Sequence, residues 1–277
     1  MEGLFMEMAD YLTAPGRRAL IYLAIRERGN WDAIYHAMKK LECPPEEEVN
    51  AVLKSIRSKA VTILDPEYPQ QLKNVYKAPF VLFYYGNLSL VSDMSRCISY
   101  VGSREASPYG AKMARMLCQD LSEEGFTIVS GLARGIDAVA GEASLKAGKA
   151  VAVLGNGVDY CFPPSNSDLQ RAIKQNGLLL SEYPGKMPPV ANQFPLRNRI
   201  IAGLSCCIVV GQAAKRSGTL ITVGYALNHG RDVCCVPFPA DEDSSCNELI
   251  KEGAPLVENV GDIYRVIGYE KEQLPDI

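Results

Sequence analysis

Three short segments combine glycines with hydroxyl and guanidinium groups: VGSR (101–104), SGLARGID (130–137) and RSGTLIT (216–222). Glycine lets a ligand approach the backbone closely, and free N–H groups at the start of a helix attract anions. A fourth segment, FPLRNR (194–199), places two arginines around an asparagine shortly before the apolar segment 204–211. Because the guanidinium fork matches phosphate oxygens, the four segments together predict a phosphate-binding cleft.

The residues expected at this cleft are small, hydroxyl-bearing, aromatic or cationic. They are Gly102, Ser103, Arg104, Ser130, Gly131, Arg134, Gly135, Phe194, Arg197, Arg199, Ser217, Gly218 and Thr219. Purely structural interpretations stay open for them: Arg197 or Arg199 could pair with Glu182 or Asp137 and hold loops together. Phe194 could belong to the core, whereas an exposed ring beside arginines would stack on nucleobases.

The elements that must position these groups follow a regular rhythm from about residue 96. Short apolar strands such as CISYVG, FTIVSG and AVAVLG alternate with amphipathic helices. This alternation predicts an α/β domain over residues 96–277: an extended Rossmann-like, doubly wound, mostly parallel sheet covered on both faces. Ligands of such sheets bind at the carboxyl ends of the strands, near the switch in strand order.

Two further segments precede that domain. Residues 1–60 contain three or four short helical patterns and predict a small all-helical domain. Residues 61–95 are rich in proline and tyrosine and end in the strand-like FVLFYYG (80–86). We interpret this segment as a linker that adds an edge strand to the sheet.

The charge is distributed unevenly around a net value of −3. Residues 96–218 carry fourteen Lys/Arg and nine Asp/Glu, whereas residues 241–277 carry three and ten. A positive middle segment can form a basic patch on an acidic protein. The acidic C-terminal segment should lie away from any bound polyanion.

The remaining composition narrows the class of protein. The start MEGLFMEMAD is acidic and unlike a signal peptide, and no apolar segment is long enough to span a membrane, so we expect a cytoplasmic protein. Nine cysteines form no CxxC pair and lie mostly in apolar segments, which is typical of reduced, buried thiols. Because His36 and His229 are the only histidines, we expect no metal site.

Nucleotide cofactors are disfavoured by the spacing of the glycines. Gly131 and Gly135 do not make the GxGxxG pattern of dinucleotide-binding folds, and VGSR has a single glycine. The GxxxxGK[ST] pattern of a P-loop is also missing. We therefore expect no cofactor.

The sequence strongly resembles the DprA/Smf (DNA-processing protein A) family of bacteria over nearly all of residues 61–267. The resemblance lies in VGSREASPYG, SGLARGIDAVAGEASLKAGKAVAVLGNGVD, FPPSN, LLLSEYP, FPLRNRIIAGLS, RSGTLIT, ALNHGRDV and CNELIKEGAPLV. It implies a Rossmann-like domain that binds single-stranded DNA, forms homodimers and loads the RecA recombinase during natural transformation. Residues 1–60 then correspond to the family's variable SAM-like or helix–hairpin–helix-like N-terminal domain.

The resemblance also assigns roles to residues. Arg104 matches the main DNA-contacting arginine. The phosphate loop is matched by Ser130, Gly131, Arg134 and Gly135, and the motif that helps to hold the DNA strand is matched by Phe194, Arg197, Asn198 and Arg199. Dimer contacts are expected around residues 246–257. Ala191 stands where several relatives have a basic residue, so either Lys186 replaces it from the loop PGKMPP or DNA binding is weaker. Three other positions depart from the family pattern: Gly141, Gln212 and Phe238.

An enzymatic alternative would use the same phosphate-binding cleft at the strand ends. Nucleoside-monophosphate hydrolases of the lysine-decarboxylase-like (LOG) type use a GGxGTxxE pattern, and RSGTLIT keeps Gly218 and Thr219 but has Thr222 in place of the glutamate. Asp137 and Glu182 are the remaining carboxylates near the cleft, and neither has an obvious partner for acid–base catalysis. We therefore expect a DNA-binding protein that is not an enzyme.

Overall fold

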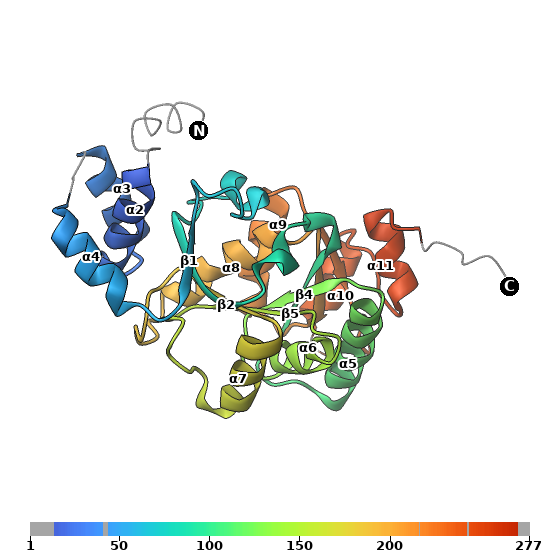
Figure 1. Ribbon diagram of the computed structural model, residues 1–277. Coiled ribbons are helices and arrows are strands. Elements are labelled where there is room, and N and C mark those ends of the chain that lie inside the picture. Colours follow the sequence, from blue (N-terminus) through green and yellow to red (C-terminus); the bar gives the residue numbers. More distant parts are fainter. Residues whose placement is uncertain (1–13, 41–43, 216, 243, 271–277) are drawn as a thin grey trace, which may run out of the picture.

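The computed structural model describes residues 14–40, 44–215, 217–242 and 244–270 (Figure 1). The chain begins in this description with three helices, α2 (Ala14–Arg26), α3 (Trp31–Lys39) and α4 (Glu46–Ser55). The Asn30 side chain accepts a hydrogen bond from Ala33 N (3.1 Å) and so caps α3. Three glutamates occupy the first turn of α4, where the helix dipole favours negative charge.

The eight-stranded sheet has the order β1-β2-β6-β5-β4-β3-β7-β8. Its strands are β1 (Lys59–Thr62), β2 (Val81–Gly86), β3 (Cys97–Gly102), β4 (Thr127–Ser130), β5 (Ala150–Leu154), β6 (Leu178–Ser181), β7 (Cys207–Gln212) and β8 (Asp232–Cys235). Pairing is antiparallel where β2 meets β1 and β6, and parallel between the other neighbours. The predicted α/β, mostly parallel sheet is confirmed.

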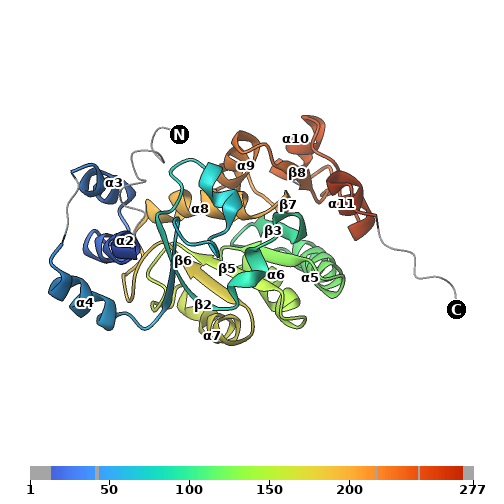
Figure 2. The ribbon, with the colours of Figure 1, turned by 45° about the horizontal axis from the view of Figure 1, so that its top comes forward.

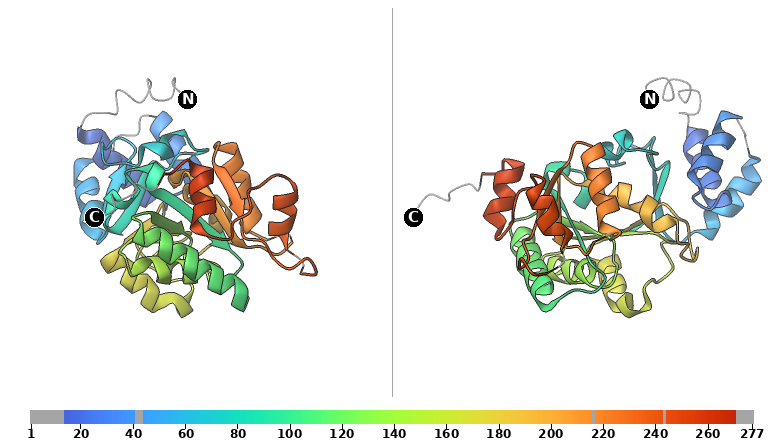
Figure 3. Two further views of the ribbon diagram at one scale, coloured as in Figure 1. Left: turned by 90° about the vertical axis from the view of Figure 1, so that its right-hand side faces the viewer. Right: turned by 180° about the vertical axis from the view of Figure 1, so that it is seen from behind.

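Helices cover both faces of the sheet. One face carries α5 (Pro108–Glu123), α6 (Ile136–Leu145) and α7 (Ser167–Asn176), and the other carries α8 (Gln193–Leu204) and α9 (Thr219–Asn228), as Figure 2 shows. Every residue of β5 and β6 is buried, and these strands are almost entirely apolar, as expected for a sheet covered on both faces. The last helices, α10 (Ser245–Lys251) and α11 (Val260–Ile267), lie at the end of the molecule opposite α2–α4 (Figure 3).

The edge of the sheet differs from the expected one. The segment FVLFYYG forms β2, but β1 pairs with its outer side, so β2 is the second strand and not the edge strand. Short 3-10 helices connect β1 to β3 and β5 to α7. They span Gln70–Asn74, Leu88–Val91, Met94–Arg96 and Pro164–Asn166.

The strand order reverses at β3. Strand β4 lies on one side of β3 and β7 on the other, so the chain winds outward in both directions from this point. The loops that follow β3, β4 and β7 therefore meet at one edge of the sheet. None of the described helices has the length and hydropathy needed to cross a membrane.

Candidate nucleic-acid interface

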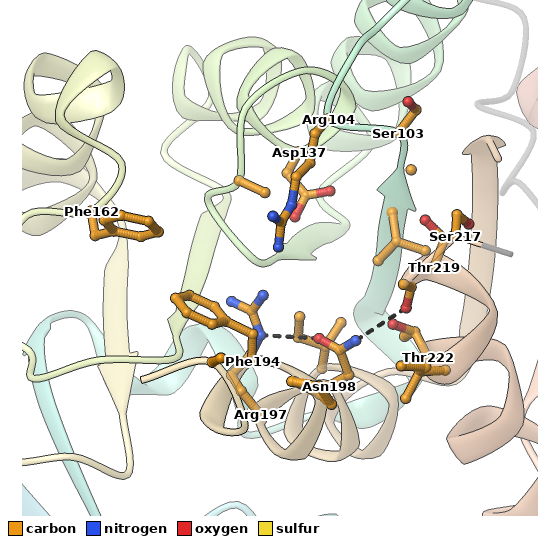
Figure 4. A pocket seen from close by; sticks show the side chains of 18 residues that line it. Ser103, Arg104, Asp137, Phe162, Phe194, Arg197, Asn198, Ser217, Thr219 and Thr222 are labelled. Atoms are coloured by element: carbon orange, nitrogen blue, oxygen red, sulfur yellow. Dashed lines mark hydrogen bonds between the residues drawn. The ribbon is translucent and has the colours of Figure 1, made fainter. Parts of the chain in front are cut away.

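Two adjoining cavities open at the carboxyl edge of the sheet (Figure 4). The larger has a volume of about 610 Å³ and the smaller about 390 Å³. Both are lined by Arg104, Ala133, Phe162, Phe194 and Arg197, so they form one continuous depression, which we call the trough. The lining residues come from the ends of β5, β4, β3 and β7, so the trough crosses four neighbouring strand ends, an arrangement that suits a chain-like ligand.

The loop after β3 forms one wall of the trough. A Cβ at Gly102 would lie 2.8 Å from Gln212 O and from the Ile136 side chain, so this position needs glycine. Ser103 N donates to Gln212 O (2.8 Å) and ties the wall to β7. The Arg104 side chain is exposed and has no ion pair or hydrogen bond among the described residues. Figure 4 shows its guanidinium pointing toward that of Arg197.

The loop after β4 forms the adjoining wall. Gly135 has φ +75°, and a side chain there would collide with the Ser103 carbonyl, so glycine is required. Asp137 Oδ2 accepts a hydrogen bond from Gly131 N (3.0 Å) and holds the loop against the first turn of α6. Arg134 is exposed, lines the smaller cavity and has no ion pair within the described parts of the chain.

Arg197 forms the floor and is only 7% exposed. Its Nη1 donates to Gly131 O (2.8 Å) and to Val153 O. Burial lowers the pKa of Arg197, the nearby Asp137 opposes this, and the positive charge of Arg104 lowers it further. Two guanidinium groups that repel each other across an open cavity make a strongly attractive position for an anion.

Asn198 connects the floor to the loop after β7. Its Oδ1 accepts from Arg197 Nε (3.2 Å), and its Nδ2 donates to Gly218 O (3.4 Å). Ser217 and Thr219 line the larger cavity beside it, and the Ser217 hydroxyl is buried without a hydrogen-bond partner. This hydroxyl and the start of α9 therefore offer donors to a ligand in the trough.

Phe162 is a lining residue that the sequence prediction missed. It is 36% exposed, and its ring lies 5.6 Å from that of Phe194 at an interplanar angle of 44°. Phe194 packs closely on Gly155, where a Cβ would be 2.7 Å from the ring. The signal in the sequence was the segment FPPSN, which joins an aromatic residue to two prolines in a loop.

The prediction for Arg199 is wrong: this residue does not line the trough. Its side chain is fully buried, and Nη2 lies 2.8 Å from both carboxylate oxygens of Glu182. Ser130 is also misassigned, because its hydroxyl is buried and donates to Tyr100 O (2.8 Å) inside the sheet. Lys186 is exposed but lies outside the residues that line the two cavities.

The four positions that depart from the family pattern lie in different parts of the structure. Ala191 lines the larger cavity and adds no charge to it. Gln212 Oε1 accepts from Ser107 N (2.9 Å) at the start of α5, and Phe238 makes an edge contact with Tyr109. Gly141 lies on α6 against α7, where a Cβ would meet Leu169 at 3.5 Å. Of the four, Ala191 has the most direct bearing on the trough.

Both carboxylates considered for catalysis have structural partners. Burial raises the pKa of Asp137, with Arg197 and backbone amides opposing the shift. Burial likewise raises the pKa of Glu182, opposed by Arg199. Thr222 stands where the hydrolase glutamate would be, and it is buried at the edge of the larger cavity. In the described parts of the chain, no group of three or more His, Cys, Asp or Glu side chains could hold a metal ion.

The fold and the trough define a doubly wound α/β protein with a cationic site at its topological switch point. The family model of the DNA recombination-mediator protein A matches residues 59–268, so the chain belongs to this family. The DNA processing protein DprA of Streptococcus pneumoniae is 44% identical over 205 residues, which are 73% of this chain and 72% of that protein. The protein Smf of Escherichia coli is 42% identical over 213 residues, or 76% of this chain and 56% of that protein.

Solved structures agree with this assignment. The crystal structure of S. pneumoniae DprA superposes with a TM-score of 0.75 at 34% identity, covering 96% of this chain and 98% of that one. The DNA processing protein A of Helicobacter pylori superposes with a TM-score of 0.69 at 26% identity, covering 78% of this chain and 99% of that one. The latter structure was described for the single-stranded DNA binding mode of the H. pylori protein.

Proposed function

We propose that the chain binds single-stranded DNA in the trough without catalysing a reaction on it. The observation that carries this proposal is the pair of guanidinium groups, Arg104 and Arg197, that face each other across the open cavity. Arg134 adds a third cation, and the rings of Phe162 and Phe194 offer surfaces on which bases stack. Family membership supports the same ligand, as does the single-stranded DNA binding mode described for the H. pylori protein.

Single strands are favoured over duplexes for a mechanical reason. The trough follows the ends of neighbouring strands between walls formed by loops, so we expect a ligand that bends freely to fit it best. A single strand bends freely, whereas duplex DNA is stiff over about 150 base pairs. Backbone amides and arginines contact phosphates without reading base edges, so the binding should be largely independent of sequence.

The test is a titration of fluorescein-labelled single-stranded and duplex oligonucleotides at two salt concentrations, followed by anisotropy. If Arg104, Arg134 and Arg197 each neutralise about one phosphate, the slope of log affinity against log salt should be about −2. Arg104→Ala should weaken binding to all base compositions alike. Equal affinity for the duplex, or a slope near zero, would contradict the proposal.

We further propose that the protein acts in the cytosol as a homodimer that protects incoming DNA and delivers it to RecA during natural transformation. The support is the family resemblance together with the exposed Leu256 (42%) in the segment 246–257 expected at the dimer contact. Two troughs in one dimer would bind one long strand with increased avidity. Light scattering of the native chain and of Leu256→Glu would test the dimer, and strand exchange with RecA would test the delivery.

A further inference from the structure

Arg199 lies at a junction of three segments, and each of its three side-chain nitrogens donates a hydrogen bond there. Besides Glu182, its Nη2 donates to Lys77 O (2.8 Å), and its Nε donates to the carbonyls of Tyr76 and Lys77 (3.1 Å each). Its Nη1 donates to Leu196 O (3.1 Å) within α8. A guanidinium fixed at every nitrogen holds α8 against the segment 76–80, which we call the strap.

The N-terminal helices hold the strap from its other side. Trp31 Nε1 donates to Ala78 O (2.8 Å), and the Trp31 ring stacks on Phe80 with centroids 5.0 Å apart. Lys77 Nζ pairs with Asp32 at 2.6 Å. Lys77 also has φ +48°, a backbone conformation that non-glycine residues adopt only when their surroundings enforce it.

The same N-terminal unit also touches the other partner of Arg199. Gly29, in the turn between α2 and α3, has φ +71° and packs on the backbone that follows β6. A Cβ at Gly29 would lie 2.7 Å from Glu182 O and 2.8 Å from the Tyr183 ring. Both groups that fix Arg199, the strap and Glu182, are therefore in contact with α2–α3.

Helix α8 connects this junction to the trough. Arg197 and Arg199 are two positions apart, which on an α-helix points them to nearly opposite sides. One side chain lines the trough and the other is buried against the strap. Whatever holds Arg199 therefore acts on α8, the same helix that carries Phe194 and Arg197 at the trough.

We infer that Arg199 is a positioning residue through which the docked N-terminal helices set the DNA affinity of the trough. This inference rests on the proposed function for its ligand. Arg199 is fully buried and cannot touch DNA, so its influence must pass through α8. Loosening the contact between α2–α3 and the strap should therefore weaken DNA binding without removing any cation from the trough.

Three variants of the full chain separate the possibilities. Trp31→Ala removes the ring and the hydrogen bond that hold the strap. The double variant Arg199→Met/Glu182→Gln removes the buried pair without leaving one unpaired charge in the core. Tyr22→Phe is the matched control, because it removes a hydrogen bond between α2 and α4 (Tyr22 Oη to Glu48, 2.9 Å) and leaves the strap untouched.

Hydrogen exchange of the DNA-free proteins gives a readout that does not depend on the proposed ligand. We expect faster exchange in residues 193–204 for Trp31→Ala and for the double variant, and native exchange for Tyr22→Phe. Unchanged exchange in this segment of Trp31→Ala would overturn the inference. If the native chain bound no single-stranded DNA, the proposed function would fail while this result still decided the coupling.

Anisotropy then measures the effect on DNA. Trp31→Ala and the double variant should each raise the Kd for a labelled oligothymidylate by about tenfold, within the usual range of coupling through packed networks. When the two sets of substitutions are combined in one chain, the losses of binding free energy should be far from additive, because both act through the strap. The salt slope should stay at the native value. A slope smaller by about 0.7 in the double variant would instead make Arg199 a phosphate contact and refute the positioning role.

Discussion

Arg197 and Asp137 hold the same residue, Gly131, from opposite ends of its backbone. Asp137 accepts a hydrogen bond from Gly131 N (3.0 Å), and Arg197 donates one to Gly131 O (2.8 Å). The buried Asp137 carboxylate and the buried Arg197 guanidinium thus fix the loop after β4, and their opposite charges offset each other. The Arg197 side chain still lines the trough.

Replacing Gly131 with alanine should displace Arg197. A Cβ there would lie 2.5–2.7 Å from three guanidinium atoms, so the guanidinium must move. If the displaced guanidinium no longer reaches a phosphate, one charge-assisted hydrogen bond to DNA is lost. Such a bond contributes about 1.5–3 kcal/mol, so the Kd for single-stranded DNA should rise roughly 10- to 150-fold. Gly224→Ala is the control, because nothing lies within 4 Å of its Cβ. Equal affinity of both variants, measured by anisotropy, would show that Arg197 does not contribute.

Adding a cation at position 191 should strengthen binding. Ala191 lines the larger cavity, so the ammonium of Ala191→Lys can reach a phosphate there. We expect a lower Kd and a salt slope steeper by about 0.7. Ala191→Met lengthens the side chain without charge and should leave the slope unchanged. A lysine variant with the native slope would mean that the strand does not pass this position.

Removing the ring of Phe162 should weaken binding without affecting the fold. The ring is 36% exposed and faces the trough, and stacking on one base contributes about 1–3 kcal/mol. Tyr160 has the same exposed fraction (36%) but does not line either cavity, so Tyr160→Ala is the control. Isothermal titration with oligonucleotides of each base should show a loss for Phe162→Ala alone. Parallel losses in both variants would point to a general disturbance of the loop.

The raised pKa of Asp137 predicts a pH dependence of stability. Its carboxyl binds a proton more tightly in the folded than in the unfolded chain, because burial raises its pKa above the ordinary 3.8. Its contribution to the free energy of unfolding is therefore largest below 3.8 and decreases as the pH rises through the raised pKa. Urea unfolding should show the native chain losing stability relative to Asp137→Asn over this window. A relative gain would mean that Arg197 outweighs burial.

The alternation of apolar strands and amphipathic helices was sufficient to predict the sheet. The same alternation predicts that the loops after β3, β4 and β7 lie together, because parallel strands bring their carboxyl ends to one edge of the sheet. The strand β1 was missed because its four residues, KAVT, carry too little periodicity to stand out. With β1 unrecognised, β2 was assigned to the edge.

The site predictions failed where side-chain direction decided the outcome. FPLRNR lies on a helix, so one of its arginines faces the trough and the other faces the core, and the sequence alone does not tell which. Ser130 ends a fully buried strand, and its hydroxyl points between strands instead of out of the sheet. Phe162 sits in an irregular loop, where no periodicity indicates exposure.

The pairing of β3 with β7 joins residues that are about a hundred positions apart, such as Ile98 and Cys207. Ser103 on one wall reaches Gln212 only after this pairing has formed. A nascent chain from whose ribosome β7 has not yet emerged therefore has three of the four strand-end loops that line the trough, but not its last wall. Affinity for a single strand should appear late in synthesis, as the last long-range register closes.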